Sequence, residues 1–200
     1  VGDVRDVDRL RRAAEAAEII IHAAAMKDVP LSELNPFEAV ATNVLGTQNL
    51  VEAALDAGVE RVIGVSTDKA AAPCNLYGAT KLVAEKLLCQ GNTYAGHRKT
   101  RFACIRYGNV VDSRGSVLHL FRDLAGKGYP LPITDPEMTR FWMTLDQAGD
   151  AILAALSQME GGEVFVPADL RSFKVIDLAY AINICTMNMA PYRMVGIRPG

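Results

Sequence analysis

The sequence contains few cysteine and histidine residues, and their spacing excludes the common metal-binding and disulfide-rich proteins. Its four cysteines, Cys74, Cys89, Cys104 and Cys185, form no CxxC pair and no dense framework, so we expect free thiols. The three histidines have no second histidine or cysteine at ligand spacing. The sequence therefore predicts no metal site.

The sequence also lacks an excess of charge of one sign and any long hydrophobic run. Its 21 basic and 23 acidic residues are mixed along the chain and give a net charge of −2, so no basic face is available for nucleic acid. Its apolar runs are far shorter than the roughly 20 residues needed to cross a bilayer, and the first residues show no signal-peptide pattern. Half of the residues are hydrophobic, so we expect a folded protein. Together these features predict a cytoplasmic protein with no membrane segment and no nucleic-acid partner.

Short β-branched runs alternate with longer amphipathic stretches, which is the order of a mainly parallel sheet covered by helices. We therefore predict an α/β fold of the Rossmann type. The predicted strands are Ile19–Ala24, Arg61–Ser66, Arg101–Arg106, Leu131–Thr134 and Val164–Pro167. The predicted helices are Pro36–Ala57, Asn75–Gln90, Val117–Ala125, Asp146–Met159 and Val175–Cys185.

The organisation of the chain predicts two parts and two cut ends. The alternation weakens after Gly108, so we expect residues 1–110 to form a partial Rossmann domain and residues 111–200 a smaller substrate lobe. No GxGxxG turn is present, although such a turn is what holds a cofactor pyrophosphate in this fold. We therefore expect an internal fragment, with the N-terminal βαβαβ half missing and the substrate lobe truncated at its C-terminus.

Tyr77 and Lys81 are four residues apart and fall on one face of a predicted helix. A lysine ammonium at that distance favours the phenolate, and Tyr77 would act as a base near neutral pH if its pKa fell by about three units. Ser66 and Thr67 end the preceding strand, where a hydroxyl can hydrogen-bond the same substrate oxygen. The alternative is a core tyrosine beside a solvated lysine, which the same spacing often represents.

This arrangement resembles the extended, sugar-nucleotide branch of the short-chain dehydrogenase/reductase superfamily. A closer resemblance covers nearly the whole chain. It rests on six motifs in order, which are Thr67–Ala70, Asn75–Lys81, Arg106–Val110, Ser113–Val117, Ile133–Phe141 and Arg198–Gly200. Together these motifs resemble the inverting UDP-N-acetylglucosamine 4,6-dehydratases, which start the pseudaminic acid pathway and are commonly filed as polysaccharide biosynthesis proteins.

The resemblance implies a lyase that converts UDP-N-acetylglucosamine to a UDP-4-keto-6-deoxy sugar with inversion at C5. Thr67, Tyr77 and Lys81 would act in oxidation at C4. Lys69 is implied as the base at C5 and Asp68 as the acid at the C6 hydroxyl, which requires a neutral lysine and a protonated aspartate. The implied cofactor is NADP, with NAD as the alternative. The alternative interpretation of Asp68 and Lys69 is a solvated pair in a loop without a catalytic role.

The resemblance also implies binding residues and a homo-oligomer. The cofactor would contact Asp3, Val4, Ala23, Ala24, Ala25, Asn43, Ser66, Tyr77, Lys81, Tyr107 and Asn109. The UDP-sugar would contact Lys27, Asn109, Arg114, Ser116, Val117, Thr134, Arg140 and Arg198, where arginine suits phosphate oxygens through its planar fork. Asp112 departs from the family pattern, which favours a small residue or glycine at that position.

Two other functions remain open at the level of sequence. A UDP-sugar 4-epimerase would keep Thr67, Tyr77 and Lys81 but would have no use for Asp68 and Lys69 as acid and base. A noncatalytic, nucleotide-sensing Rossmann protein belongs to another class, and such proteins usually lack the tyrosine and the lysine. The presence of Tyr77 and Lys81 favours an enzyme.

Overall fold

The computed structural model describes residues 2–113 and 115–196, which divide into two compact units. The first unit takes in the described residues up to Tyr107 and also Gly149–Pro167. The second takes in Gly108–Ala148 and the described residues from Ala168 onward. This division differs from the expected one, which placed every residue after 110 in a single lobe. The chain returns to the first unit because the short strand β7 (Val164–Phe165) pairs with β3 of its sheet.

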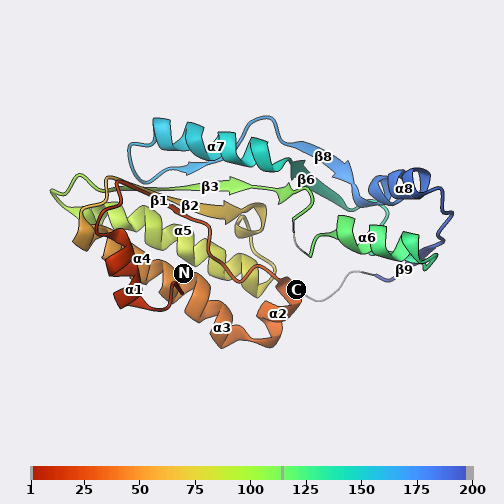
Figure 1. Ribbon diagram of the computed structural model, residues 1–200, viewed down its shortest axis with the longest axis horizontal. Helices are drawn as coiled ribbons and strands as arrows, with labels where there is room; N and C mark the ends of the chain where they lie inside the picture. The colour runs from red at the N-terminus through yellow and green to blue at the C-terminus, as the bar shows by residue number, and fades with distance from the viewer. Residues whose placement is uncertain (1, 114, 197–200) are drawn as a thin grey trace. The chain divides into compact units, whose positions relative to one another are not determined.

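The first unit is built on a four-stranded parallel sheet with the strand order β1-β2-β3-β7 (Figure 1). Its longer strands are β1 (Ile19–His22), β2 (Arg61–Thr67) and β3 (Arg101–Tyr107). This sheet confirms the predicted α/β class. Because all four strands run the same way, their carboxyl ends meet at one edge, where ligands of open α/β sheets bind.

Both faces of β2 and β3 are covered by helices, as Figure 1 shows. Val62 and Phe102 point to a core with α4 (Gly46–Ala57) and α5 (Leu76–Ala95). Ile63 and Ile105 point to the opposite core, which is completed by α7 (Leu145–Gln158). Burial on two faces explains why these strands are nearly continuous hydrophobic runs.

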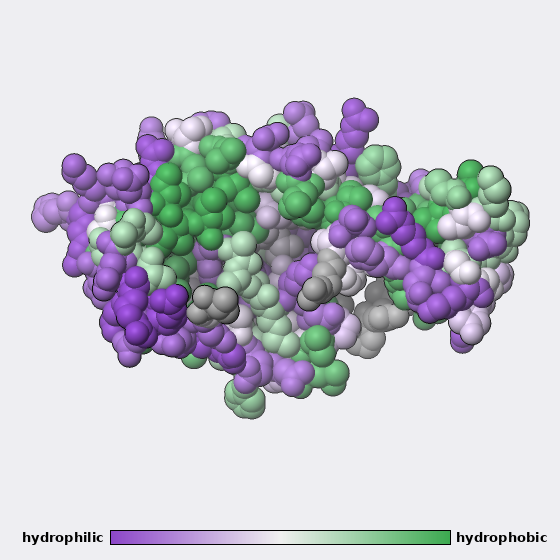
Figure 2. All heavy atoms as spheres, viewed as in Figure 1, coloured by the Kyte–Doolittle hydropathy of each residue, from purple (hydrophilic) through white to green (hydrophobic). Residues whose placement is uncertain are grey.

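The edge strand β1 has one uncovered face. Ile19 and Ile21 are 50% and 48% exposed, whereas Ile20 packs against the core with α4. Figure 2 shows a hydrophobic area over the part of the molecule where Figure 1 draws β1. An uncovered apolar edge of this kind favours association with further polypeptide.

The helix predicted over Pro36–Ala57 consists of three consecutive pieces. These are α3 (Pro36–Val40), the π-helical turn η1 (Ala41–Leu45) and α4. A π-turn inserts one extra residue per turn and is often found at functional sites. Apolar spacing carries no signal for it, so the sequence predicted one regular helix.

The other differences in the first unit have local causes. The short helices α1 (Val7–Ala14) and α2 (Val29–Leu34) were not predicted, although Asp6 and Asp28 cap them through their side chains. Helix α5 continues beyond the predicted end at Gln90 to Ala95. It passes Gly91, where a side chain would press on the ring of Phe102.

The second unit combines two small sheets with two helices. One sheet has the order β4-β6-β8 and the other pairs β5 with β9. The strands are β4 (Asn109–Val110), β5 (Leu131–Ile133), β6 (Thr139–Met143), β8 (Arg171–Lys174) and β9 (Tyr192–Met194). Helices α6 (Val117–Gly126) and α8 (Val175–Thr186) enclose a core that contains Phe121 and Ile133. The strands β6, β8 and β9 were not predicted because they are short and largely exposed.

The described residues contain neither a membrane-spanning helix nor a cluster of metal ligands. None of their helices is both long and apolar enough to cross a membrane. No three of their His, Cys, Asp and Glu side chains gather in a way that would hold a metal ion. The described cysteines are free thiols.

Candidate active site

Three polar residues follow one another at the carboxyl end of β2. The Thr67 hydroxyl caps the 3-10 turn η2 (Asp68–Ala70) by accepting from the Lys69 main-chain N–H, and it donates to the Asp68 carboxylate at 2.9 Å. The Lys69 ammonium donates to the same carboxylate oxygen at 3.0 Å. Both charged side chains are about a quarter to a third exposed, so an incoming ligand can reach the pair.

Helix α5 begins where it brings Tyr77 next to η2. The Asn75 side chain caps the helix by accepting from Gly78 N–H at 2.8 Å, and Glu33 of α2 accepts from Leu76 N–H at 2.7 Å. At Gly78 a Cβ atom would lie 2.3 Å from the carbonyl oxygen of Lys69. Only glycine therefore permits this close approach of the helix to the turn that carries Asp68 and Lys69.

Tyr77 is largely buried among Thr67, Asp68 and Tyr107. Burial raises the pKa of Tyr77, the hydrogen bond with the Thr67 side chain lowers it, and electrostatic interaction with Asp68 and Tyr107 raises it further. The expectation that Lys81 would lower this pKa is wrong for the protein without ligands. Burial dominates, and the ammonium of Lys81 is directed toward the main chain of β2.

Lys81 is 4% exposed and donates a hydrogen bond to the carbonyl oxygen of Val65 at 2.8 Å. Burial lowers the pKa of Lys81, while the nearby Cys104 and Glu85 raise it. An ammonium has three donors, and only this one is used among the described residues. Two donors are therefore left for a ligand.

The structure distinguishes the two hydroxyls that the sequence offered. Ser66 is 6% exposed, and its hydroxyl donates to the Glu85 carboxylate inside the protein. Thr67 instead bonds Tyr77 and Asp68. Thr67 is thus the hydroxyl beside the tyrosine, whereas the hydroxyl of Ser66 is turned into the protein.

Asn43 sits in the π-helical turn and connects it to α5. Its amide donates to Thr80 Oγ1 and to the carbonyl oxygen of Met26, both at 3.0 Å, and its carbonyl accepts from Met26 N–H at 2.8 Å. The residue therefore contacts the neighbour of Lys81 rather than Lys81. Behind it, Thr47 donates to the main-chain carbonyl of Asn43 at 2.7 Å and lies 3.0 Å from His22 Nε2.

The buried His22 makes folding stability depend on pH. Burial and the charge of Lys81 lower the pKa of His22 from 6.5 to about 4. The unfolded chain therefore binds a proton as the pH falls below 6.5, while the folded chain remains neutral until about 4. We expect the free energy of unfolding to decrease by up to about 3 kcal/mol between pH 7 and 4 from this group.

Urea unfolding from pH 7 to 4 checks this prediction. The variant His22→Gln should flatten the curve, whereas the exposed His97→Gln should leave it unchanged. Equal pH dependence in both variants would contradict the assignment to His22.

The remaining predicted cofactor residues of the first unit lie near its surface. Ala23 and Ala24 are exposed, Ala25 is half-buried, and all three follow β1 at the same sheet edge as Thr67. Asp3 is exposed and forms an ion pair with Arg5 at 2.7 Å, which holds the pKa of Asp3 at about 2. Val4 is half-buried beside Gly46, where a Cβ atom would lie 2.6 Å from Val4 Cγ2. Lys27, which was predicted to contact the UDP-sugar, is exposed in the loop after β1.

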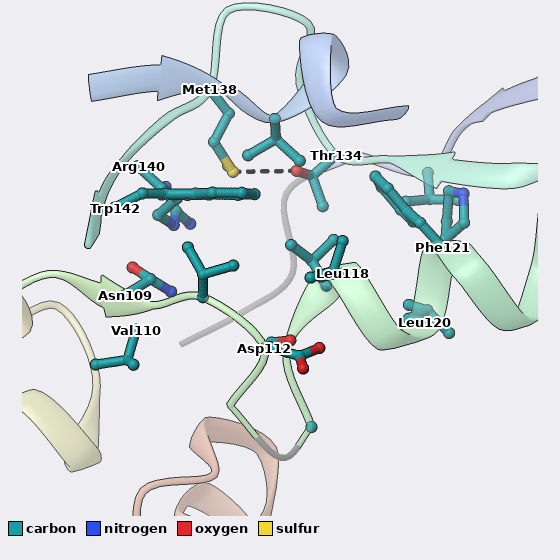
Figure 3. A pocket seen from close by; sticks show the side chains of 17 residues that line it. Asn109, Val110, Asp112, Leu118, Leu120, Phe121, Thr134, Met138, Arg140 and Trp142 are labelled. Atoms are coloured by element: carbon teal, nitrogen blue, oxygen red, sulfur yellow. Dashed lines mark hydrogen bonds between the residues drawn. The ribbon is translucent and has the colours of Figure 1, made fainter. Parts of the chain in front are cut away.

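The second unit contains a cavity of about 350 Å³ (Figure 3). Five of the predicted substrate residues line it, namely Asn109, Ser116, Val117, Thr134 and Arg140. Two buried oxygen atoms, Asn109 Oδ1 and Ser116 Oγ, have no hydrogen-bond partner among the described residues. Buried polar atoms in proteins are normally paired, so these two are suited to a ligand. Arg114 and Arg198 lie outside the described residues.

Two residues that line this cavity, Trp142 and Asp112, differ from what the sequence led us to expect or explain it. Trp142 lines it and was missed, because β6 was not predicted; Arg140 stands two residues earlier on the same strand and so shares its face (Figure 3). Asp112 has a φ of 62°, which lies in the left-handed region that glycine adopts most easily. This conformation explains the glycine or small residue expected there.

Comparison with known proteins identifies the group to which these features belong. Residues 1–200 match the family described as polysaccharide biosynthesis protein. The UDP-N-acetylglucosamine 4,6-dehydratase (inverting) of Campylobacter jejuni is 47% identical over all of this chain and 59% of its own length. A UDP-glucose 4-epimerase of Rickettsia rickettsii is 39% identical over all of this chain and 58% of its own length.

The fold has a close counterpart among solved structures. The X-ray structure of Pen from Bacillus thuringiensis superimposes with a TM-score of 0.95 and 38% identity, covering all of this chain and 63% of that one. The chain thus spans about three fifths of the length of the proteins it matches.

Proposed function

This chain belongs to the polysaccharide biosynthesis protein family, and on that premise we propose that it is the catalytic part of an inverting UDP-N-acetylglucosamine 4,6-dehydratase. The observation that carries the proposal is the pairing of Asp68 with Lys69 directly beside Thr67 and Tyr77. Tyrosine and lysine alone suit several reactions of a sugar nucleotide. An acid and a base next to them are needed only when water is eliminated.

The first half of the proposed reaction is oxidation at C4 of the sugar. Tyr77 removes the proton of the C4 hydroxyl, and Thr67 holds the same oxygen. Lys81 binds ribose hydroxyls with its unused donors, while the small side chains of Ala23, Ala24 and Ala25 let a cofactor approach the main chain. A bound nicotinamide cofactor, NADP or NAD, supplies the hydride acceptor at C4 and later the hydride donor at C6.

The second half is the loss of water from C5 and C6. The 4-keto group makes the C5 hydrogen acidic, and Lys69 removes it as a proton. Asp68 gives a proton to the C6 hydroxyl, which leaves as water. The hydride taken from C4 then adds to C6 while a proton adds to C5 from the face opposite to the one that lost it, which inverts C5. A proton must pass from Lys69 to Asp68 before these transfers, because a protonated lysine cannot accept a proton and an ionised aspartate cannot donate one.

We assign the nucleotide of the substrate to the cavity of the second unit. Its volume of about 350 Å³ falls within the range of small-molecule sites, about 300–1,000 Å³. The two unpartnered oxygens of Asn109 and Ser116 can receive or share hydrogen bonds with the nucleoside. Arg140 uses one donor, to the carbonyl oxygen of Thr139 at 2.7 Å, among the described residues, and its guanidinium suits a phosphate.

Arg140→Ala should weaken substrate binding more than it slows the reaction. Loss of a charged hydrogen bond costs about 1.5–3 kcal/mol, so we expect the KM for the UDP-sugar to rise about 10- to 100-fold with a smaller change in kcat. Steady-state kinetics of the full-length protein measure this, with the exposed Arg12→Ala as the matched control. An unchanged KM would remove Arg140 from the substrate site.

The assay that tests the proposed function is incubation of the full-length protein with UDP-N-acetylglucosamine and mass analysis of the product. A dehydratase gives a product lighter by one water. The epimerase alternative, favoured by the identity to the Rickettsia rickettsii protein, gives a product of unchanged mass but altered configuration at C4. An unchanged substrate would support the noncatalytic alternative.

A further inference from the structure

Helix α5 presents a third residue on the face that carries Tyr77 and Lys81. Glu85 follows Lys81 by four residues, as Lys81 follows Tyr77, so the three lie along one stripe of the helix. Glu85 is 2% exposed, although a carboxylate is rarely buried so completely unless it is paired. The proposed reaction gives it no role.

The three residues of this stripe contact three consecutive residues of β2. Tyr77 bonds the side chain of Thr67, and the Lys81 ammonium donates to the carbonyl oxygen of Val65 at 2.8 Å. The third contact is made by Ser66, whose hydroxyl donates to Glu85 Oε1. Each of the last three residues of β2 is therefore held against α5, and Glu85 receives the contact from Ser66.

The neighbouring strand fixes Glu85 from the other side. Arg106 of β3 lies opposite Ser66 in the sheet register. Its guanidinium donates to both carboxylate oxygens of Glu85, from Nε at 2.8 Å and from Nη2 at 2.6 Å. A forked arginine–carboxylate pair of this kind is strong and directional. The carboxylate consequently has one orientation, set by β2 and β3 together.

We propose that Glu85 is a positioning residue, which holds Lys81 charged and in place behind Tyr77 by connecting α5 to the ends of β2 and β3. This inference rests on the proposed function for the roles of Tyr77 and Lys81. Burial lowers the pKa of Lys81, and the nearby Cys104 and the negative charge of Glu85 oppose that shift. In the complex with cofactor and sugar that the proposed function requires, a charged Lys81 then favours the phenolate of Tyr77.

Titratable groups face this stripe from its own helix and from neighbouring elements, with Arg106 and Cys104 of β3 and Cys89 of α5 facing Glu85. Lys81 faces Glu85 on its own helix, Cys104 on β3 and His22 on β1. Tyr77 faces Asp68 of η2 and Tyr107 of β3. Glu85 therefore influences Tyr77 through Lys81, and a change of its charge should be visible in the pH dependence of the reaction.

The test uses Glu85→Gln and Glu85→Asp in the full-length protein, with the exposed Glu52→Gln as the matched control. Glutamine keeps the shape and removes the charge. For Glu85→Gln we expect the acidic limb of the kcat–pH profile to move up by about one pH unit. Calorimetry should show an affinity for the reduced nicotinamide cofactor that is about tenfold weaker. The KM for the UDP-sugar should change little. Glu85→Asp keeps the negative charge, but the shorter side chain loses contact with one of its partners. The kcat should therefore fall while the pH profile stays near that of the wild type.

Circular dichroism shows which variants fold. If Glu85→Gln does not fold, Glu85→Asp and Ser66→Ala carry the test, since both retain the charge opposite Arg106. Wild-type kcat, pH profile and cofactor affinity in any folded Glu85 variant would overturn the proposal, as would a fall in kcat with an unmoved profile in Glu85→Gln. Cofactor affinity does not depend on dehydration. A wild-type protein that binds the cofactor without losing water from the sugar would therefore refute the proposed reaction while still testing Glu85.

Discussion

Tyr77→Phe should lower the turnover of the full-length protein at least 100-fold with UDP-N-acetylglucosamine. The variant removes the group that accepts the C4 hydroxyl proton, and positioned acid–base groups contribute about 10²- to 10⁴-fold to rates. The ring remains, so its contacts with the buried surroundings are kept. Formation of reduced cofactor after rapid mixing measures the step directly.

The matched control for this variant lies on the same helix. Tyr94 is 64% exposed near the end of α5, and Tyr94→Phe should turn over as the wild type does. Unfolding curves of the two variants separate a loss of chemistry from a loss of structure. Turnover of Tyr77→Phe within a few-fold of the wild type would show that another group removes the C4 proton.

The sequence was a good guide to the sheet and a poor guide to breaks in regular structure. The strands β2 and β3 are hydrophobic on both faces, and only a doubly covered parallel sheet buries them. The π-helical turn at Ala41–Leu45 was invisible, because its extra residue leaves apolar spacing nearly intact. The return of residues 149–167 to the first unit depends on a long-range strand pair, which no local pattern encodes.

The sequence predicted some residues of the candidate site and missed others. Motif spacing brought Thr67, Asp68 and Tyr77 together correctly, since all three occupy one strand end and the helix that follows it. It did not reveal that Ser66 points inward or that Glu85 lies behind Lys81. The signal for Glu85 was present as a glutamate four residues after Lys81, but such pairs are usually solvent-exposed contacts on a helix surface. Only burial distinguishes the two cases.

Lys69→Ala should stop the proposed reaction after its first half, which makes it the sharpest separation of dehydratase from epimerase. Thr67, Tyr77 and Lys81 are untouched, so the C4 hydroxyl can still be oxidised. The C5 proton then has no base, because the other nearby lysine, Lys81, is buried and donates to Val65. Reduced cofactor should accumulate beside a 4-keto sugar that retains its C6 hydroxyl.

An epimerase behaves differently in this variant. Hydride would return to C4, the reduced cofactor would not build up, and Lys69→Ala would have little effect on turnover. Absorbance of the reduced nicotinamide after rapid mixing, with mass analysis of the quenched sugar, distinguishes the two outcomes. The exposed Lys86→Ala on α5 serves as the matched control and should release dehydrated product at the wild-type rate. If Lys69→Ala released the dehydrated sugar at an unchanged rate, Lys69 would have no part in the reaction. The ion pair with Asp68 would then be a surface contact that contributes at most about 1 kcal/mol to stability.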